Sequence, residues 1–346
     1  MSHADLQESL LAWYRANRRD LPWRRTRDPY AIWISEAMLQ QTRVETVLSY
    51  WPRFLERFPD LASLAGASEE SVLGAWSGLG YYRRAKALRQ AARAIVEHHG
   101  GSFPKDRASV LGLPGIGRYT AGAVLSIAFG QREPLVDGNV ARVLSRLFAI
   151  EHELGSASSQ RELWDLAQEL LPEARDCGDW NQALMELGAT ICTARDPKCG
   201  ICPLSRRCKA QAESRVADLP RARPRPLPVE VSVEVLVVRK GGAWLFEQRA
   251  EDAPRMSGMW ELPTREVGTR SGLFRAAWEP RGLFSAGREI GRARHTITRH
   301  RIEVSVREGA FSGAVPMPAE FRWIEPRSTA TLGLTGMARK ALALAT

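Results

Sequence analysis

The stretch Leu111–Leu147, LGLPGIGRYTAGAVLSIAFGQREPLVDGNVARVLSRL, decides the fold. Its turn, LPGIG at 113–117, holds too much Gly and Pro to continue a helix or a strand. Helical runs are expected on both sides, at 107–111 and 118–129, so the pattern predicts a helix-hairpin-helix. The two glycines let the backbone adopt positive φ. The amides of Gly115 and Gly117 then point outward at a helix start, where they can bind a phosphate oxygen.

A Gly-x-Gly alone would favour an ordinary turn between two helices. The residues that follow this turn argue for a more specific motif. Past Gly130 and Pro134 the chain reads VDGNV at 136–140, and then a helical pattern resumes. Nearer the N-terminus lies the decapeptide WISEAMLQQT at 33–42. Together these segments resemble the helix-hairpin-helix DNA glycosylases, and within them the adenine DNA glycosylases of the MutY family. The resemblance is strong before residue 230 and weak after it.

Composition and charge limit the classes of protein that this chain can be. Its 346 residues are 44% hydrophobic and 25% charged, which is typical of a globular protein with two domains. No apolar run is long enough to span a bilayer and the N-terminus has no signal-peptide pattern, so the sequence predicts a cytoplasmic protein, nucleoid-associated if bacterial, without a membrane partner. The excess of 49 Lys and Arg over 39 Asp and Glu favours a polyanionic partner, nucleic acid before an anionic membrane.

The hydrophobic period changes after residue 213. Helical spacing dominates before it, whereas four prolines alternate with arginines across 214–229 and predict a stiff, extended linker. Beyond 230 the valines recur with period two, and strands are expected at 231–237, at 243–248 and at about 296–306, with a closing helix at 334–344. The predicted protein is multidomain: an all-α helix-hairpin-helix glycosylase region at 1–213, the Pro/Arg linker 214–229 and an α+β domain at 230–346.

Glu36 is the first of two carboxylates that carry the predicted chemistry. It lies at helical spacing with Ile32, Trp33 and Leu39, so it faces an apolar side, where a carboxyl group tends to keep its proton and can act as a general acid. A core Glu paired with Arg43 or another base is the simpler interpretation from composition. The family resemblance reverses that preference and implies that Glu36 protonates the adenine leaving group.

Asp137 directly precedes a helix, where Asp commonly serves as the N-cap and stays ionised. Cleavage of an N-glycosidic bond develops oxocarbenium character at C1′, which an ionised carboxylate stabilises. A protonated Glu36 and an ionised Asp137 meet both needs. The resemblance implies that Asn139 orients Asp137 by a hydrogen bond.

Tyr119 distinguishes branches of the superfamily. Bifunctional relatives that resemble endonuclease III carry a Lys at this place, and its amine attacks C1′ to form a Schiff base. With Tyr there, the sequence predicts a monofunctional enzyme that lacks this lyase route.

An enzyme that acts on a base must first extrude it from the duplex. The resemblance implies duplex-probing roles for Gln41, Tyr81 and, more loosely, Leu39, and an adenine pocket that includes Trp23, Arg24 and Glu186. Taken singly, each of these residues fits an ordinary structural role, and only their joint occurrence supports the assignment.

Four of the five cysteines lie in one loop with the spacing Cys192-x6-Cys199-x2-Cys202-x5-Cys208. In a cytosolic chain this indicates metal binding instead of disulfides. Four thiolates suit tetrahedral zinc or a [4Fe–4S] cluster, and a single C-x-x-C pair slightly favours the cluster. The family resemblance, whose spacing this reproduces, implies the [4Fe–4S] cluster. Cys177 lies outside the pattern and is expected to be a core thiol.

The C-terminal region resembles the Nudix fold of this family. The segment MWELP at 259–263 fits the strand before the Nudix catalytic helix, but neither Arg265-Glu266 nor Arg288-Glu289 continues into that metal-binding motif. A recognition module is therefore expected instead of a pyrophosphatase. Where the family reads 8-oxoguanine with a Phe-Ser-His tip, this chain has Ile-Thr-Arg at 297–299, and Thr298 keeps the hydroxyl.

These observations predict a monomeric adenine glycosylase of base-excision repair that acts on adenine opposite 8-oxoguanine or guanine in duplex DNA. One alternative is another mismatch glycosylase that removes thymine opposite guanine. The other is a DNA-binding relative with an inert site, against which the pair Glu36 and Asp137 argues.

Overall fold

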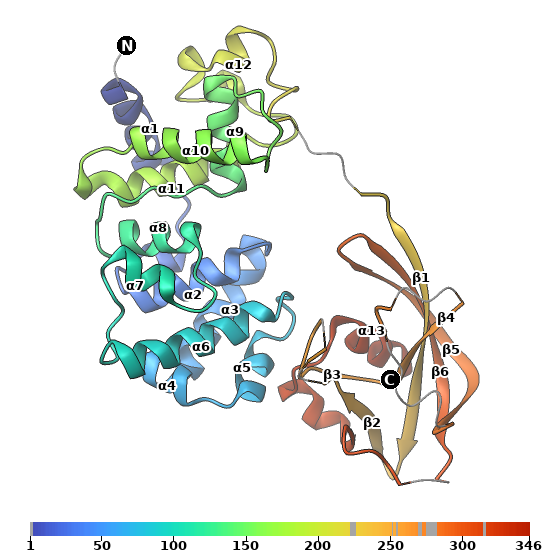
Figure 1. The fold of residues 1–346 in the computed structure, drawn as a ribbon. Coiled ribbons are helices and arrows are strands. Elements are labelled where there is room, and N and C mark those ends of the chain that lie inside the picture. Colours follow the sequence, from blue (N-terminus) through green and yellow to red (C-terminus); the bar gives the residue numbers. More distant parts are fainter. Residues whose placement is uncertain are drawn as a thin grey trace. The chain divides into compact units, whose positions relative to one another are not determined.

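The computed structural model describes residues 3–221, 226–250, 252–253, 255–268, 272–274, 282–313 and 316–346. The chain divides into two compact units, Met1–Ala65 with Gln90–Pro224 and Gly66–Arg89 with Arg225–Thr346. Figure 1 shows that the first unit is helical and that the second combines helices with a sheet. The chain passes finally into the second unit within the segment 214–229 that the sequence predicts as a linker.

The first unit is built from helices and short 3-10 turns. They are α1 (His3–Asn17), η1 (Pro22–Arg24), α2 (Pro29–Leu39), α3 (Val44–Arg57), α4 (Leu61–Gly66), the C-terminal part of α6 (Arg83–His98), α7 (Arg107–Gly112), α8 (Arg118–Ile127), α9 (Gly138–Phe148), α10 (Ala157–Glu169), α11 (Ala174–Thr190), η2 (Cys199–Ile201), η3 (Ser205–Arg207) and α12 (Lys209–Ala212). The helical runs predicted at 107–111 and 118–129 are confirmed as α7 and α8, with end shifts of one and two residues.

Close packing of α8, α9 and α11 depends on glycines that have no room for a side chain. A Cβ at Gly122 would lie 2.0 Å from the Pro134 carbonyl oxygen. A Cβ at Gly178 would lie 2.8 Å from the Ser126 carbonyl oxygen. Any larger residue would force these segments apart, because a real Cβ is not found so close to a backbone oxygen.

The predicted helix-hairpin-helix is formed by α7 and α8. Asp106 caps α7 by accepting a hydrogen bond of 2.8 Å from the Ser109 amide. Gly115 adopts φ 74°, as the turn requires. Gly117 does not: it is the N-cap of α8 with φ −97° and ψ 179°, an extended conformation that any residue adopts.

The second unit contains a mixed sheet of seven strands in its described ranges, ordered β3-β2-β1-β6-β5, with β4 paired to β1 and β7 to β2. The strands are β1 (Val229–Lys240), β2 (Ala243–Gln248), β3 (Trp260–Glu261), β4 (Thr264–Val267), β5 (Phe284–Ile297), β6 (His300–Phe311) and β7 (Phe321–Ile324). Strands β1 and β6 run parallel, whereas the other pairs are antiparallel. The helical elements are α5 (Glu69–Trp76), the first turns of α6, η5 (Pro326–Thr331) and α13 (Gly336–Ala345).

The core of this unit forms on the valine face that the period of two predicts. Val231, Val233, Val235 and Val237 are all buried in one cluster, together with Met337 and Ala341 of α13. Figure 1 shows α13 beside the sheet. The alternating valines thus bring one face of β1 into the core that α13 shares, while α13 itself packs mainly against β5.

Two expectations about this unit need correction. The segment 296–306 is not one strand, because β5 and β6 form a hairpin that turns at 298–299, where Thr298 adopts φ 53°. The segment 66–89, which the sequence predicts to belong to the region 1–213, clusters with the C-terminal unit instead. Helical spacing predicts an apolar face without showing which domain that face packs against.

Candidate active site

Helix α2 carries Glu36 into the interior of the first unit. Asp28 starts the helix by accepting hydrogen bonds from the amides of Tyr30 and Ala31, at 3.1 and 3.2 Å. Every residue from Tyr30 to Met38 is buried, so the helix is enclosed on all sides. Glu36 is only 4% exposed. The burial that helical spacing predicts for this carboxyl group is therefore confirmed.

The partner of Glu36 is Tyr119 in the first turn of α8. The Tyr119 hydroxyl donates to Glu36 Oε2 and lies 3.6 Å from Met185 Sδ. No ion pair to Glu36 occurs in the described ranges, and Arg43 is an exposed N-cap of α3. The alternative of a core Glu paired with Arg43 is therefore not supported.

Burial controls the protonation of this carboxyl group. It raises the pKa of Glu36 to about 7, the Tyr119 hydrogen bond opposes the rise, and the charge of Asp137 adds to it. Burial also raises the pKa of Tyr119, which stays a hydrogen-bond donor. Glu36 thus keeps a substantial protonated fraction near neutral pH, which a general acid requires.

Asp137 is the N-cap of α9, as predicted. Its Oδ1 accepts a hydrogen bond of 2.7 Å from the Val140 amide, and its Oδ2 accepts one of 2.9 Å from Asn139 Nδ2. Burial raises the pKa of Asp137, while the bonds from Val140 and Asn139 lower it. The net rise differs from the effect expected of a capping carboxylate, because the half-buried carboxyl group is partly removed from water.

Asn139 is in turn held from two sides. Its Oδ1 accepts a hydrogen bond of 2.9 Å from Arg142 Nη2, which also donates to the Gly188 carbonyl at 2.8 Å. A Cβ at Gly188 would lie 2.6 Å from the Asn139 Cβ, so α11 approaches this residue only because a glycine stands there. Sequence reasoning missed Arg142, whose only local signal is its spacing of three residues from Asn139.

Glu186 on α11 forms the centre of a second charged group. It accepts from Arg19 Nε and from Arg24 Nη2, both at 2.8 Å. Burial alone would raise the pKa of Glu186, but the hydrogen bonds from Arg19 and Arg24 outweigh it and lower the pKa to about 2. The structure thus brings the predicted Arg24 and Glu186 together. Arg19 was missed because its partner is 167 residues away.

Trp23 belongs to the same neighbourhood but is enclosed. It is 6% exposed and packs edge-on against Trp51, with ring centroids 6.2 Å apart. Arg24 extends over the Tyr14 ring at 5.5 Å. The aromatic-basic segment is therefore part of the packing around Glu186 as well as a candidate wall of a base pocket.

The predicted duplex-probing residues differ in exposure. Gln41 is exposed with φ 58°, directly after α2, and Leu39 is half-buried. In the second unit, Tyr81 is 54% exposed with φ 49°. Thr298 is exposed with φ 53°. Left-handed backbone is costly for side chains other than Gly and Asn, and such strain concentrates at functional sites.

The hairpin leaves the start of α8 open. Gly117 caps α8 without a side-chain hydrogen bond, and nothing lies within 4 Å of the place where its Cβ would be. Arg118 lies over the Trp164 ring at 4.0 Å. The first amides of a ten-residue helix are therefore accessible to an anion.

The four cysteines of loop 192–208 carry free thiols in one neighbourhood. Arg146, which is 3% exposed, donates to Cys192 Sγ and accepts from Cys208 Sγ through its carbonyl, both at 3.4 Å. Burial raises the pKa of Cys202 to about 11, and the charges of the other three thiols add to the rise. Four thiols within electrostatic reach of one another, beside one buried guanidinium, have the donor chemistry of an anionic thiolate cluster.

Two further facts concern metal binding. Cys177 is buried and contacts the Pro172 carbonyl at 3.3 Å, as expected of a core thiol. Within the described ranges, no three His, Cys, Asp or Glu side chains form a group fit for a metal ion. The loop therefore supplies the donor atoms of a metal site, while its thiols are not arranged as a preformed ligand group.

Comparisons with known proteins identify the family. Residues 34–169 match the HhH-GPD superfamily of base excision DNA repair proteins, and residues 192–208 match the iron–sulfur binding domain of endonuclease III. The adenine DNA glycosylase of Homo sapiens is 50% identical over 212 residues, 59% of this chain and 39% of that protein. The adenine DNA glycosylase of Arabidopsis thaliana is 34% identical over 403 residues, 97% of this chain and 63% of that protein.

The chain belongs to the MutY family of helix-hairpin-helix DNA glycosylases. It spans less than two thirds of the length of either relative. The structure of a thermostable thymine-DNA glycosylase superimposes with a TM-score of 0.54 at 32% identity, over 61% of this chain and 97% of that one. A non-covalent endonuclease III–DNA complex superimposes with a TM-score of 0.52 at 21% identity over 62% of this chain and 98% of that one, which shows the fold alone.

The iron–sulfur match assigns the cysteine loop of this MutY-family chain. The match indicates a [4Fe–4S] cluster, and the range that it covers holds Cys192, Cys199, Cys202 and Cys208. Arg142 links this loop to Asn139: its Nε donates to the Cys192 carbonyl at 2.8 Å and its Nη2 donates to Asn139 Oδ1 at 2.9 Å. Separately, none of the helices in the described ranges is long and apolar enough to cross a bilayer.

Arg146 should stabilise the bound cluster. Replacing Arg146 by Met removes the buried cation beside Cys192 and Cys208 while keeping much of the side chain's bulk, so we expect less than the roughly four irons per chain of a full cluster and faster bleaching in air. Iron analysis and visible absorbance of anaerobically purified protein measure both. Arg175→Met, which removes an 88% exposed Arg from the same unit, is the matched control. Equal iron content and bleaching in Arg146→Met and wild type would contradict this role.

Proposed function

We propose that the chain is a monofunctional, monomeric adenine DNA glycosylase that hydrolyses the N-glycosidic bond of adenine opposite 8-oxoguanine or guanine in duplex DNA. The observation that carries the proposal is the buried Glu36, with a pKa near 7, hydrogen-bonded to Tyr119 and within electrostatic reach of Asp137. Among adenine DNA glycosylases, the human protein is 50% identical over the aligned region.

The catalytic roles follow from the two carboxyl environments. Protonated Glu36 donates its proton to a ring nitrogen of the extruded adenine, which makes the base a neutral leaving group. Asp137, held by Asn139 and the Val140 amide, stabilises the positive charge that develops at C1′. Tyr119 is a phenol with a raised pKa and cannot form a Schiff base, so water completes the reaction without strand cleavage by that route.

Extrusion and capture of the base use the remaining predicted residues. Gln41, Leu39 and Tyr81 engage the duplex around the gap, and the open N-terminus of α8 binds a backbone phosphate. The ion pair of Arg24 and Glu186, with Trp23 beside it, forms the polar wall of the adenine pocket. Glu186 stays an anion throughout because Arg19 and Arg24 hold its pKa at about 2.

The domain at 230–346 is proposed to be a Nudix-like recognition module. Arg265-Glu266 lies on β4 and Arg288-Glu289 on β5, so neither pair begins the metal-binding helix of a pyrophosphatase. Thr298 stands at the exposed hairpin tip, and its hydroxyl donates to the Ile297 carbonyl at 2.7 Å. With its proton engaged, this oxygen offers only lone pairs. These suit the N7–H donor of 8-oxoguanine and not the N7 acceptor of guanine.

A second candidate activity is thymine release from a T:G mismatch, because the thermostable thymine-DNA glycosylase is 32% identical to this chain. A general acid with a pKa near 7 favours the purine, which carries basic ring nitrogens that thymine lacks.

Base release from A:8-oxoguanine, A:G and T:G duplexes tests the activity. Wild type should release adenine from the first two faster than thymine from the third. Glu36→Gln, which removes the proton donor but keeps the shape, should lower the single-turnover rate at least about 100-fold without weakening duplex binding. Glu97→Gln, at a site with a 62% exposed side chain, is the matched control. Wild-type turnover in Glu36→Gln would refute the acid role, and faster thymine release would favour the alternative.

The pH profile tests the cause of the Glu36 pKa. Because the protonated form acts, adenine release should fall as pH rises through about 7. The Tyr119 hydrogen bond lowers this pKa, so Tyr119→Phe should move the falling limb to higher pH. Single-turnover rates between pH 5 and 9 measure the limb. A limb that moves to lower pH in Tyr119→Phe would contradict the assignment.

Thr298→Val tests lesion recognition in the full chain. Loss of one hydrogen bond, worth roughly 0.5–1.5 kcal/mol, should reduce the preference for A:8-oxoguanine over A:G by roughly twofold to tenfold. Thr296→Val, exposed on β5 two residues earlier, is the control and should leave the preference unchanged. An unchanged preference in Thr298→Val would place lesion recognition elsewhere.

A further inference from the structure

Two exposed elements of the second unit are proposed above to touch DNA, and both are anchored to the start of α13. One is the turn at 78–81, which ends in Tyr81, and the other is the β5–β6 hairpin with Thr298 at its tip. The segment 334–339 contacts both elements. It therefore offers a mechanical connection between them.

The turn is anchored through the Leu334 carbonyl. Ser77 Oγ donates to this oxygen at 3.4 Å, and the Tyr82 hydroxyl donates to it at 3.3 Å. The same hydroxyl accepts from the Gly78 amide at 3.3 Å. Arg339 donates to Ser77 Oγ through Nε at 3.2 Å and through Nη2. Ser77, Tyr82 and Leu334 are each at most 6% exposed, so water does not compete for these bonds.

The turn needs such anchors because its own backbone is unfavourable. Gly78 and Gly80 adopt φ 107° and 71°, and Tyr81 itself adopts φ 49°. Arg84 also stabilises the turn. It donates to the Gly80 carbonyl at 3.2 Å, and its guanidinium lies over the Tyr81 ring at 5.5 Å. Strained backbone persists only where surrounding contacts over-determine it, and the bonds to Leu334 and Arg339 provide part of that constraint.

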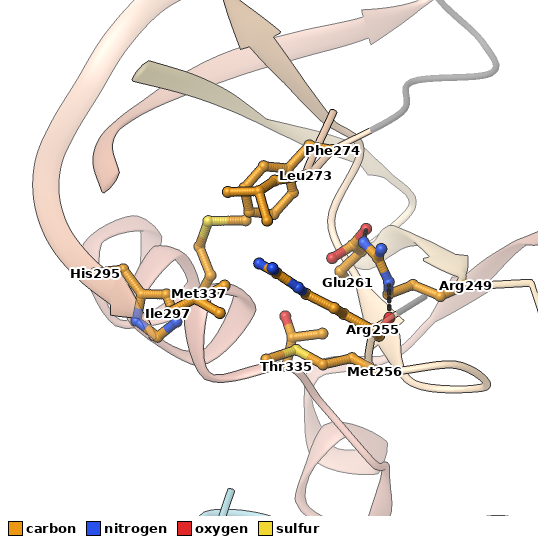
Figure 2. A pocket seen from close by; sticks show the side chains of 10 residues that line it. All are labelled: Arg249, Arg255, Met256, Glu261, Leu273, Phe274, His295, Ile297, Thr335 and Met337. Atoms are coloured by element: carbon orange, nitrogen blue, oxygen red, sulfur yellow. Dashed lines mark hydrogen bonds and ion pairs between the residues drawn. The ribbon is translucent and has the colours of Figure 1, made fainter. Parts of the chain in front are cut away.

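The β5–β6 hairpin also contacts the segment 334–339. Figure 2 shows His295 and Ile297 of β5 lining one pocket with Thr335 and Met337. A Cβ at Gly336 would lie 3.3 Å from His295 Cε1, so the first residue of α13 rests directly on this strand. The Thr335 amide donates to the Trp260 carbonyl at 3.0 Å and fixes the segment to β3. The end of β5 is therefore connected to the Leu334 carbonyl through the short segment 334–337.

We infer that Arg339, together with Ser77 and Tyr82, is a positioning residue that couples occupancy of the Thr298 hairpin to the conformation of the Tyr81 turn. The inference rests on the proposed function. When the hairpin tip binds 8-oxoguanine, the end of β5 is held, the start of α13 is held against it, and the Tyr81 turn is stabilised in its probing conformation. Part of the preference for the oxidised partner then arises at Tyr81 and not at the lesion itself.

The test compares single-turnover adenine release from A:8-oxoguanine and A:G duplexes. Arg339→Met should lower the ratio of the two rates at least about threefold while the A:G rate stays within about twofold of wild type. Arg339→Lys should restore part of the ratio because it keeps a donor. Arg288→Met, an 80% exposed Arg on β5, removes the same charge and should leave the ratio unchanged.

A double variant separates coupling from independent damage. Each single variant should lower the ratio of the A:8-oxoguanine rate to the A:G rate. The double variant Arg339→Met with Thr298→Val should lower this ratio little further than the more affected single variant does, because both changes interrupt one connection. Tyr82→Phe removes only the hydroxyl that reaches Leu334 and provides a second, milder variant if Arg339→Met folds poorly.

The outcomes are distinguishable. If Arg339→Met lowers the adenine-release rate equally on both duplexes and also lowers the melting temperature, Arg339 only stabilises the fold. If the losses of the rate ratio add up in the double variant, the hairpin and the Tyr81 turn act independently. Either result overturns the inference while the proposed function stands. Absence of adenine release by the wild type from either duplex would instead overturn the proposed function.

Discussion

A carboxyl group buried without a cation bound to it is the constraint on which the active site depends. Glu36 lies on a helix that is buried from Tyr30 to Met38, and its hydrogen-bond partner is the neutral phenol of Tyr119. An ionised carboxylate there would be costly, so burial moves its pKa to about 7. Glu186, which is buried in the same unit, has the opposite protonation state, because two arginines keep it ionised. The two glutamates differ in protonation because only one has cationic partners.

Close packing of the helices around Glu36 and Glu186 brings segments that are distant in the sequence within hydrogen-bonding distance. Glycines at 122, 178 and 188 allow α8, α9 and α11 to approach closely, and the last of them admits Asn139 against α11. Arg142 and Arg146, one turn apart on α9, then connect the active site to the cluster loop. Helix α9 thus begins with Asp137, the proposed catalytic carboxylate, as its cap and continues with the two arginines that bond to the cysteine loop.

Sequence reasoning succeeded where the signal is local. The burial of Glu36 follows from helical spacing, the capping role of Asp137 from the residue before a helix, and the valine face of β1 from a period of two. It failed where partners are far apart in the chain, as for Arg19 with Glu186 and Arg146 with Cys208. At Thr298 the β-branched side chain by itself predicts extended strand, whereas the family resemblance places a tip at 297–299, and the β5–β6 hairpin turns there. The attachment of 66–89 to the C-terminal unit depends on single contacts such as Tyr82 to Leu334, which no local pattern encodes.

The most direct test of the central claim is the protonation state of the Glu36 carboxyl itself. Infrared difference spectroscopy of wild type against Glu36→Gln isolates this group from all other carboxyls. A protonated Glu36 should give a carboxylic-acid C=O band at pH 6 that is replaced by carboxylate bands as pH rises through about 7. A spectrum that shows only carboxylate bands for Glu36 at pH 6 would contradict its acid role, because a fully ionised Glu36 could not serve as the proton donor.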